Sequence, residues 1–273
     1  MNNGGGGNGA RILIAIAIAL FSAVSYFFST QTNAVTGQKQ HVSISAQQEA
    51  QLGQQEAPKM AEQFGGLDPD AAAQKVVSDV GTGLQAHSDA SKSPVKIQYY
   101  LLADKRTINA FALPGGPVFI TRALFDKLQT RGQLAGVLGH ETGHVAARHT
   151  AQQMAKQGLT SGIAGAAVVG TSDSNNYYQH SAEASAVVGL LNLKYTRDDE
   201  KEADKLGVRF MGEAGYDPRA MVGVMEILDK ASSGSPRGPD FLQTHPAPQN
   251  RIPLIKQEIE REFPQGVPAG MQG

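Results

Sequence analysis

The chain has 273 residues, enough for one well-packed domain with short extensions, and a composition of 41% hydrophobic and 18% charged residues is that of a globular protein. A formal net charge of −1 excludes a broad basic surface, so nucleic acid is not an expected partner. The absence of cysteine excludes disulfides, thiolate ligands, a cysteine nucleophile and a lipidated cysteine anchor. Any metal site must therefore use histidine and carboxylate.

An apolar segment near the amino terminus is predicted to cross a membrane. Residues 12–28 hold no charge, and their length of 17 residues is at the lower limit for a bilayer span and above the usual apolar length of a cleaved signal peptide. Arg11 precedes the segment and no charge follows it until Lys39, which places the amino terminus in the cytoplasm and the rest of the chain outside it. We therefore expect residues 1–30 to form an uncleaved anchor.

A cleaved signal peptide is the alternative, with residues 32–34 (Thr-Asn-Ala) as a poor cleavage site. Both interpretations export the remainder of the chain, so a periplasmic or other extracytoplasmic location is expected. The polar residues 31–44 lack periodicity and are predicted to be a linker. Residues 45–263 are predicted to form one folded domain, followed by a disordered tail at 264–273.

The first half of the domain is predicted to contain two helices and then short strands. The helices cover residues 45–60 and 68–86, and Asp68 caps the second. Residues 95–102 are an expected strand, and 110–121 are expected to form two short strands joined by a Pro-Gly-Gly-Pro turn. Because proline cannot donate to a ladder, one of these two strands is expected at a sheet edge.

A long helix is predicted over residues 130–157, with Thr130 as its cap. Four glycines fall on one line of this helix: Gly132, Gly136, Gly139 and Gly143. Each glycine costs about 1 kcal/mol relative to alanine within a helix. Their alignment therefore predicts very close packing of this line against another helix or backbone.

The second half of the domain is predicted to be helical. Residues 157–193 are rich in glycine, alanine and serine, and form either small-residue helices packed on the domain, which their short apolar stretches favour, or a face resting on the membrane. Further helices are expected at 196–214, 217–230 and 251–263, with a loop at 231–240. The predicted fold class is therefore α+β, mainly helical with a small β-sheet or hairpin.

The sequence His140-Glu141-Thr142-Gly143-His144 follows the H-E-x-x-H pattern on a predicted helix. Histidines four apart lie one turn above each other, so both imidazoles can reach one Zn²⁺ while Glu141 projects toward the open side of the metal. Zn²⁺ lowers the pKa of bound water to about 7, and Glu141 can take the proton from that water and later pass it to the leaving amine. The competing interpretation is a pair of histidines on a helix surface.

A catalytic zinc needs a third protein ligand, and a later helix presents Glu200 and Asp204 on one small, apolar face. Two carboxylates on such a face are costly to bury unless they meet a cation or a hydrogen-bond donor, and a zinc ion with its histidines supplies both. We predict that Glu200 is the ligand and that Asp204 orients a liganding imidazole or donates a proton. A salt bridge with Arg197 or Lys201 is the alternative.

Weaker candidates for the third ligand are His180, Glu202 and His245. On the predicted helix, His149 points about 160° away from the two motif histidines. We therefore assign His149 a structural role.

Several segments together resemble the membrane-associated gluzincin metallopeptidase family, which includes the CAAX prenyl proteases, the HtpX heat-shock proteases and the periplasmic BepA-like proteases. These segments are 109–116, 140–149, 197–204 and Thr244-His245-Pro246, and the resemblance extends over about residues 45–263. It implies a zincin-like fold. The roles it implies are metal ligand for His140, His144 and Glu200, catalytic base for Glu141, and proton donor or orienting group for Asp204.

The resemblance is closest to the short periplasmic branch. One apolar span does not match the several spans of the prenyl proteases or HtpX, and no helical repeat array follows the domain, which leaves an outer-membrane assembly role without support. The resemblance also implies that the strand at 109–113 is the edge that pairs with substrate backbone. Because Thr-His-Pro recurs near the metal in relatives, His245 is a candidate to occupy the open metal position in a resting state.

These features predict a zinc-dependent endopeptidase that is tethered to a membrane and acts on unfolded or misassembled proteins. The alternative is a hydrolysis-inactive, metal-containing, chaperone-like binding protein, which would have no need of Glu141 beside the metal. A membrane scaffold built on the small-residue stretch is a further alternative, but it leaves the buried acids of the helix at 196–214 unexplained. The sequence carries no signal for a particular oligomeric state.

Overall fold

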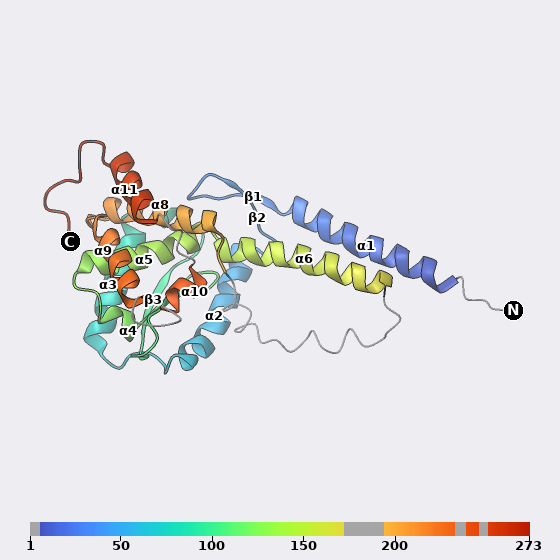
Figure 1. Cartoon of the computed structure of the whole chain (residues 1–273), viewed down its shortest axis with the longest axis horizontal. Coiled ribbons are helices and arrows are strands. Elements are labelled where there is room, and N and C mark those ends of the chain that lie inside the picture. Colours follow the sequence, from blue (N-terminus) through green and yellow to red (C-terminus); the bar gives the residue numbers. More distant parts are fainter. Residues whose placement is uncertain (1–5, 172–193, 233–238, 246–250) are drawn as a thin grey trace.

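The computed structural model describes residues 6–171, 194–232, 239–245 and 251–273. Its body is a mainly helical α+β fold, as predicted, in which helices pack around a three-stranded sheet. Two long helices, α1 (Gly6–Phe28) and α6 (His149–Thr171), project together from this body (Figure 1).

Helix α1 is, within the described part of the chain, the one helix that is long and apolar enough to cross a membrane. Helix α6 lies along it, and at their contact a Cβ on Gly162 would overlap the side chain of Ser22 (Figure 1). The prediction that residues 157–193 pack on the domain is therefore wrong for 157–171, which lie along α1. Residues 172–193 lie outside the described residues.

The segment predicted to be a polar linker is folded. β1 (Thr30–Thr32) and β2 (Lys39–His41) form an antiparallel hairpin. Between them, Asn33 Oδ1 accepts hydrogen bonds from the backbone amides of Val35 and Thr36, which closes a turn. Asn33 Nδ2 donates to the carbonyl oxygen of Ala146 at 2.8 Å, so this hairpin is tied to the domain rather than being an open tether.

The first two helices of the domain are present, the second with a later start than predicted. α2 (Ala46–Gln63) begins with a capping box formed by Ser45 and Gln48. α3 (Ala71–Ala86) begins later than predicted, because Asp70 rather than Asp68 accepts from the first free backbone amides. A short 3₁₀ turn, η1 (Asp89–Lys92), leads from α3 toward the sheet.

The sheet consists of β3 (Gln98–Leu102), β4 (Ala110–Ala112) and β5 (Pro117–Thr121) in the order β3-β5-β4. β5 pairs parallel to β3 and antiparallel to β4. The prediction that one of the strands beside the turn lies at an edge is confirmed, and that strand is β4. One face of the sheet packs in the main core with α3 and α5, and the other packs on α2.

After the short α4 (Arg122–Phe125), α5 (Arg131–Ala146) carries the H-E-x-x-H sequence and is capped by Thr130. The prediction of one helix as far as residue 157 is wrong, because the chain breaks after Ala146 and restarts as α6. At the break, Arg148 has a φ of 57°, in the left-handed region that non-glycine residues rarely adopt.

The last part of the domain is helical, with α8 (Arg197–Glu213), α9 (Ala220–Ser232), α10 (Phe241–Thr244) and α11 (Arg251–Glu262). Three of these match predicted helices, and α10 follows the segment expected to be a loop. Residues 264–273, expected to be disordered, return to the body. Gln272 N donates to Gly215 O at 3.0 Å, and Gln272 O accepts from Asp217 N at 2.8 Å.

The predicted line of glycines on α5 is where other helices cross it. A Cβ on Gly139 would lie 3.5 Å from the carbonyl oxygen of Gly207, and one on Gly143 would lie 2.8 Å from that of Ala203. The prediction of very close packing is thus confirmed: the partner is α8 at Gly139 and Gly143, and α9 at Gly136. This crossing brings the acidic face of α8 within reach of the α5 histidines.

Candidate metal centre

Three elements bring four side chains together in the interior of the domain. His140 and His144 lie on adjacent turns of α5, Glu200 lies in the first turn of α8, and His245 follows α10. All four are buried, and one nitrogen or oxygen atom from each lies within 4.8 Å of the others. The structure therefore brings together the two motif histidines, the predicted third ligand and one of the weaker candidates.

The separations among these atoms match those expected around a tetrahedral zinc ion. His140 Nε2 lies 3.1 Å from His144 Nε2 and 3.3 Å from His245 Nδ1. Glu200 Oε1 lies 3.4 Å from His144 Nε2 and 2.9 Å from His245 Nδ1. Zinc–nitrogen bonds of about 2.0–2.1 Å place tetrahedral ligands about 3.3 Å apart. The residues present therefore fit a zinc-sized cation.

A hydrogen bond behind His140 determines which of its nitrogens faces the cluster. His140 Nδ1 lies 2.9 Å from Asp204 Oδ1, and an ionised carboxylate can only accept. Nδ1 therefore carries the proton, and Nε2 presents its lone pair to the centre of the cluster. Burial lowers the pKa of His144 well below its ordinary value, which keeps this imidazole in the neutral form that binds metals.

Arg251, the first residue of α11, contacts two carboxylates of α8, those of Asp204 and Glu200. Its Nε and Nη2 donate to Asp204 at 2.7 and 2.8 Å, and its Nη1 lies 3.2 Å from Glu200 Oε2. Burial alone would raise the pKa of Asp204, but Arg251 and His140 lower it below its ordinary value. Of the two roles predicted for Asp204, this environment favours orienting His140 over donating a proton.

The contacts of Glu200 do not support the alternative of a salt bridge with Arg197 or Lys201. Its carboxylate faces His144, His245 and Arg251, whereas Lys201 pairs with Asp198 at 3.0 Å on the surface. Burial would raise the pKa of Glu200, but His245 and His144 lower it below its ordinary value. The carboxylate is therefore ionised and directed at the cluster, as a metal ligand must be.

Glu141 projects into the same buried space. Neither of its carboxylate oxygens has a hydrogen-bond partner among the described residues, and His245 Nε2 lies 3.6 Å from its Oε1. Burial raises the pKa of Glu141, with His245 and His140 acting against that effect. A buried carboxylate without a hydrogen bond is costly for folding, which is typical of a group retained for function.

Aromatic rings enclose two of the histidines. Tyr195 stacks on His144 with ring centroids 3.9 Å apart and holds its hydroxyl 3.0 Å from Thr150 Oγ1. Phe241 stacks on His245 with centroids 4.5 Å apart. Neither aromatic residue was found from the sequence, because a lone tyrosine or phenylalanine between helices has no pattern that marks it as part of a site.

The remaining candidates for the third ligand lie elsewhere. His180 lies outside the described residues. Glu202 is not part of the cluster, and its Oε2 lies 3.2 Å from His149 Nε2. The prediction that His149 points away from the motif histidines is wrong, because the break at Arg148 turns His149 back until its Nδ1 is 2.9 Å from His144 Nδ1.

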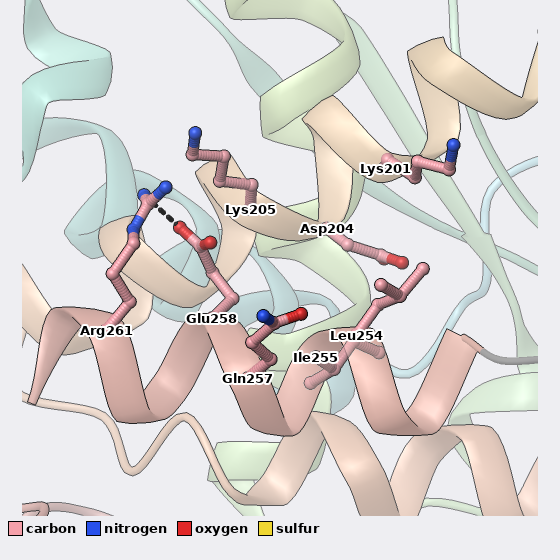
Figure 2. Close-up of a pocket in the computed structure, with 8 residues that line it drawn as sticks. All are labelled: Lys201, Asp204, Lys205, Leu254, Ile255, Gln257, Glu258 and Arg261. Atoms are coloured by element: carbon pink, nitrogen blue, oxygen red, sulfur yellow. Dashed lines mark hydrogen bonds and ion pairs between the residues drawn. The ribbon is translucent and has the colours of Figure 1, made fainter.

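A cavity of about 350 Å³ lies on the outer side of α8, where it meets α11 (Figure 2). Figure 2 shows Lys201 and Lys205 extending from α8 and a paired Glu258 and Arg261 on α11. Asp204 reaches this cavity, but Glu141 does not line it. The cavity therefore lies behind the carboxylate that supports His140, and we do not assign it to substrate.

Two histidines of an H-E-x-x-H helix beside a glutamate of a second helix define a metallopeptidase centre of the gluzincin class. Comparison with known families agrees with this class. The chain belongs to Peptidase family M48, whose sequence profile matches residues 71–259.

Several characterised proteins are similar to this chain. It is 30% identical over 254 residues to the beta-barrel assembly-enhancing protease of Escherichia coli (strain K12), which covers 88% of this chain and 50% of that protein. It is 33% identical over 175 residues to the mitochondrial metalloendopeptidase OMA1 of Schizosaccharomyces pombe, with 62% of this chain and 50% of that protein covered. Metalloprotease YcaL of Escherichia coli (strain K12) is 30% identical over 167 residues, with coverage of 61% and 63%. The chain thus spans about half the length of the first two relatives.

Proposed function

We propose that this protein is a zinc-dependent endopeptidase that cleaves unfolded or misassembled proteins outside the cytoplasm. The observation that carries this proposal is the buried cluster of His140, His144 and Glu200, beside which Glu141 has no hydrogen bond to any described residue. Membership of Peptidase family M48 and the metalloendopeptidase relatives support it.

His140, His144 and Glu200 are the proposed zinc ligands. Their nitrogen and oxygen donors are the types that zinc prefers, and three protein ligands are usual for catalytic zinc. When bound, the ion supplies Lewis-acid chemistry that acidifies water and polarises a carbonyl group. Asp204 supports this set by fixing the proton of His140 on Nδ1, and Arg251 in turn fixes Asp204.

Glu141 is the proposed general base. Its carboxylate is buried, has no hydrogen-bond partner among the described residues, and has a pKa raised by burial. A base with a raised pKa holds a proton more firmly, so Glu141 can take a proton from the attacking water and return it to the leaving amine. This use of Glu141 separates a peptidase from a chaperone-like binding protein.

Substrate binding is proposed at β4, which pairs with β5 on one side only among the described strands. β4 lies against α5, so a peptide added along its free edge would run close to the metal helix. Added strands are recognised mainly through main-chain hydrogen bonds. Unfolded and misassembled chains offer such backbone, and the Escherichia coli relative is named for beta-barrel assembly.

His245 is proposed to hold the centre in a resting state. Its Nδ1 lies among the donor atoms of the other three ligands, at the position a catalytic zinc keeps open for water or substrate. Opening would require His245 to leave this position, and the short α10 before it is the element that would move.

The anchor and the location of the domain are also part of this proposal. α1 is proposed to cross the membrane, with Arg11 on the cytoplasmic side and the body of the domain on the other, while α6 lies along α1. This arrangement keeps the peptidase near proteins that are inserted in or exported through the membrane. Fractionation together with the mass of the mature protein tests whether residues 1–30 are retained.

The test of the catalytic proposal is cleavage of unfolded casein by the purified full chain and by Glu141→Gln. We expect the variant to keep its zinc and to lose about 10²–10⁴-fold in rate, as removal of a general base does. Casein bound but not cleaved by the zinc-loaded wild type would favour the chaperone-like alternative. Equal cleavage by the two proteins would exclude Glu141 as the base.

A further inference from the structure

The break between α5 and α6 returns a third histidine to the metal centre. A continuous helix would carry His149 to the far side of α5, but after the turn at Arg148 its Nδ1 lies 2.9 Å from His144 Nδ1. His149 is buried, and its other nitrogen lies 3.2 Å from Glu202 Oε2. Glu202, His149 and His144 therefore form a continuous line of contacts that ends at the proposed metal ligand.

The order of groups along this line determines where each proton lies. Glu202 is a carboxylate and can only accept, so His149 Nε2 carries a proton and donates it. In this arrangement His149 Nδ1 accepts, and His144 donates from its own Nδ1, 2.9 Å away. As a result, His144 Nε2 has its lone pair free, and this is the nitrogen that lies 3.1 Å from His140 Nε2 and 3.4 Å from Glu200 Oε1.

We propose that His149 is a positioning residue, which with Glu202 behind it fixes the tautomer and ring orientation of His144 for metal binding. Asp204 has the same effect on His140 directly, through one carboxylate contact. For His144 the corresponding carboxylate is that of Glu202, and the imidazole of His149 lies between the two. The inference rests on the proposed function, because it concerns a ligand of the proposed zinc.

The backbone that places His149 is held by distant parts of the chain. Arg148 adopts a left-handed conformation that costs about 1 kcal/mol or more for a residue with a side chain. Its guanidinium donates to Glu49 Oε2 at 2.7 Å, to the Ile44 carbonyl at 3.0 Å and to Gln31 Oε1 at 3.1 Å. These bonds, from α2 and the amino-terminal hairpin, stabilise the turn that directs His149 at His144.

Zinc affinity of the full chain tests the inference, measured by competition with a chromophoric chelator for wild type, His149→Leu and His149→Asn. Asparagine can place its side-chain oxygen where His149 Nδ1 accepts, whereas leucine keeps bulk without an acceptor. We expect His149→Leu to weaken zinc binding about 10–100-fold, the effect typical of groups behind a ligand. His149→Asn should recover most of that loss. Lys201→Gln, on the exposed face of α8 beside Glu202, should bind zinc as wild type does.

The visible spectrum of the Co²⁺-substituted proteins gives a second readout that does not depend on activity. We expect an altered ligand-field band in His149→Leu and a band close to wild type in His149→Asn. Equal zinc affinity and spectra in all three proteins would overturn the inference, as would equal losses in both variants, since the second result indicates packing alone. Wild-type zinc binding and casein cleavage, measured in the same series, report on the proposed function separately.

Discussion

Gly143 of α5 lies directly against the backbone of Ala203 of α8: a Cβ at position 143 would be 2.8 Å from the Ala203 carbonyl oxygen. Real carbon and oxygen atoms do not approach so closely without one of them moving. Gly143 stands one residue before His144, and Ala203 stands one residue before Asp204. The distance between these two backbones therefore sets the distance between the histidines and the carboxylates of the centre.

Gly143→Ala should separate α5 from α8. We expect a loss of about 1–3 kcal/mol in the free energy of unfolding, as for other overpacked sites, together with weaker zinc binding. Gly83→Ala is the matched control, because Gly83 lies in α3 with no atom near its missing Cβ. Gly83→Ala should raise the free energy of unfolding by about 0.5–1 kcal/mol. Urea unfolding of the two variants checks both signs, and equal stability of Gly143→Ala and wild type would contradict the packing account.

Asp204→Asn distinguishes the two roles predicted for Asp204. If Asp204 orients His140, the variant should bind zinc about 10–100-fold more weakly and recover activity when zinc is supplied in excess. A proton donor would give the opposite pattern, with a fall in kcat at unchanged zinc affinity. Chelator competition and casein kinetics at saturating zinc decide between them.

His245→Ala should raise basal proteolysis, since the position that His245 fills among the ligands would become open to water and substrate. Zinc content should stay near that of wild type, because three ligands remain. Gln243→Ala, an exposed change on α10, is the control and should leave the casein rate unchanged. Unchanged or lower activity of His245→Ala with normal zinc would count against a resting state held by this residue.

Glu49→Ala removes one member of a buried ion pair, since Glu49 and Arg148 are both buried and their atoms lie 2.7 Å apart. The guanidinium left behind has lost its charge partner, and we expect a loss of about 3–5 kcal/mol in stability. Lys75→Ala breaks an ion pair with Asp79 that is exposed, and should cost less than about 1 kcal/mol. Thermal or urea unfolding of the two variants gives the comparison.

Much of the centre could be predicted from the sequence because helical periodicity fixes which residues share a face. That periodicity placed His140 and His144 one turn apart, and it placed Glu200 and Asp204 together on a small-residue face of α8. The glycine line on α5 predicted a close helix crossing, and the structure has one with α8. These are local patterns, and the structure brings the residues together as the patterns suggest.

The break after Ala146 could not be predicted, because Ala147 and Arg148 have good helix propensity. The turn is stabilised instead by Glu49 and other groups about 100 positions earlier, which no local pattern reveals. Helical periodicity gives the wrong direction for His149 for the same reason, because the turn at Arg148 redirects it.

Arg251 and Tyr195 were missed because their roles depend entirely on tertiary contacts. Arg251 stands at the start of α11, far from Asp204 in the sequence, and only folding brings the two together. Tyr195 reaches His144 by stacking. The hairpin at residues 30–41 has short, polar strands, and it is held by long-range contacts, such as those of Asn33 with Ala146 and Gln31 with Arg148, that no local pattern reveals.

Elemental analysis of metal in the purified chain and in Glu200→Gln tests the central claim most directly. The account predicts about one zinc ion per chain in the wild type and less zinc in the variant, because the cluster then loses its one carboxylate ligand and keeps imidazoles alone. A wild-type protein without stoichiometric metal would contradict the account, and so would a variant that retains zinc as firmly as the wild type does.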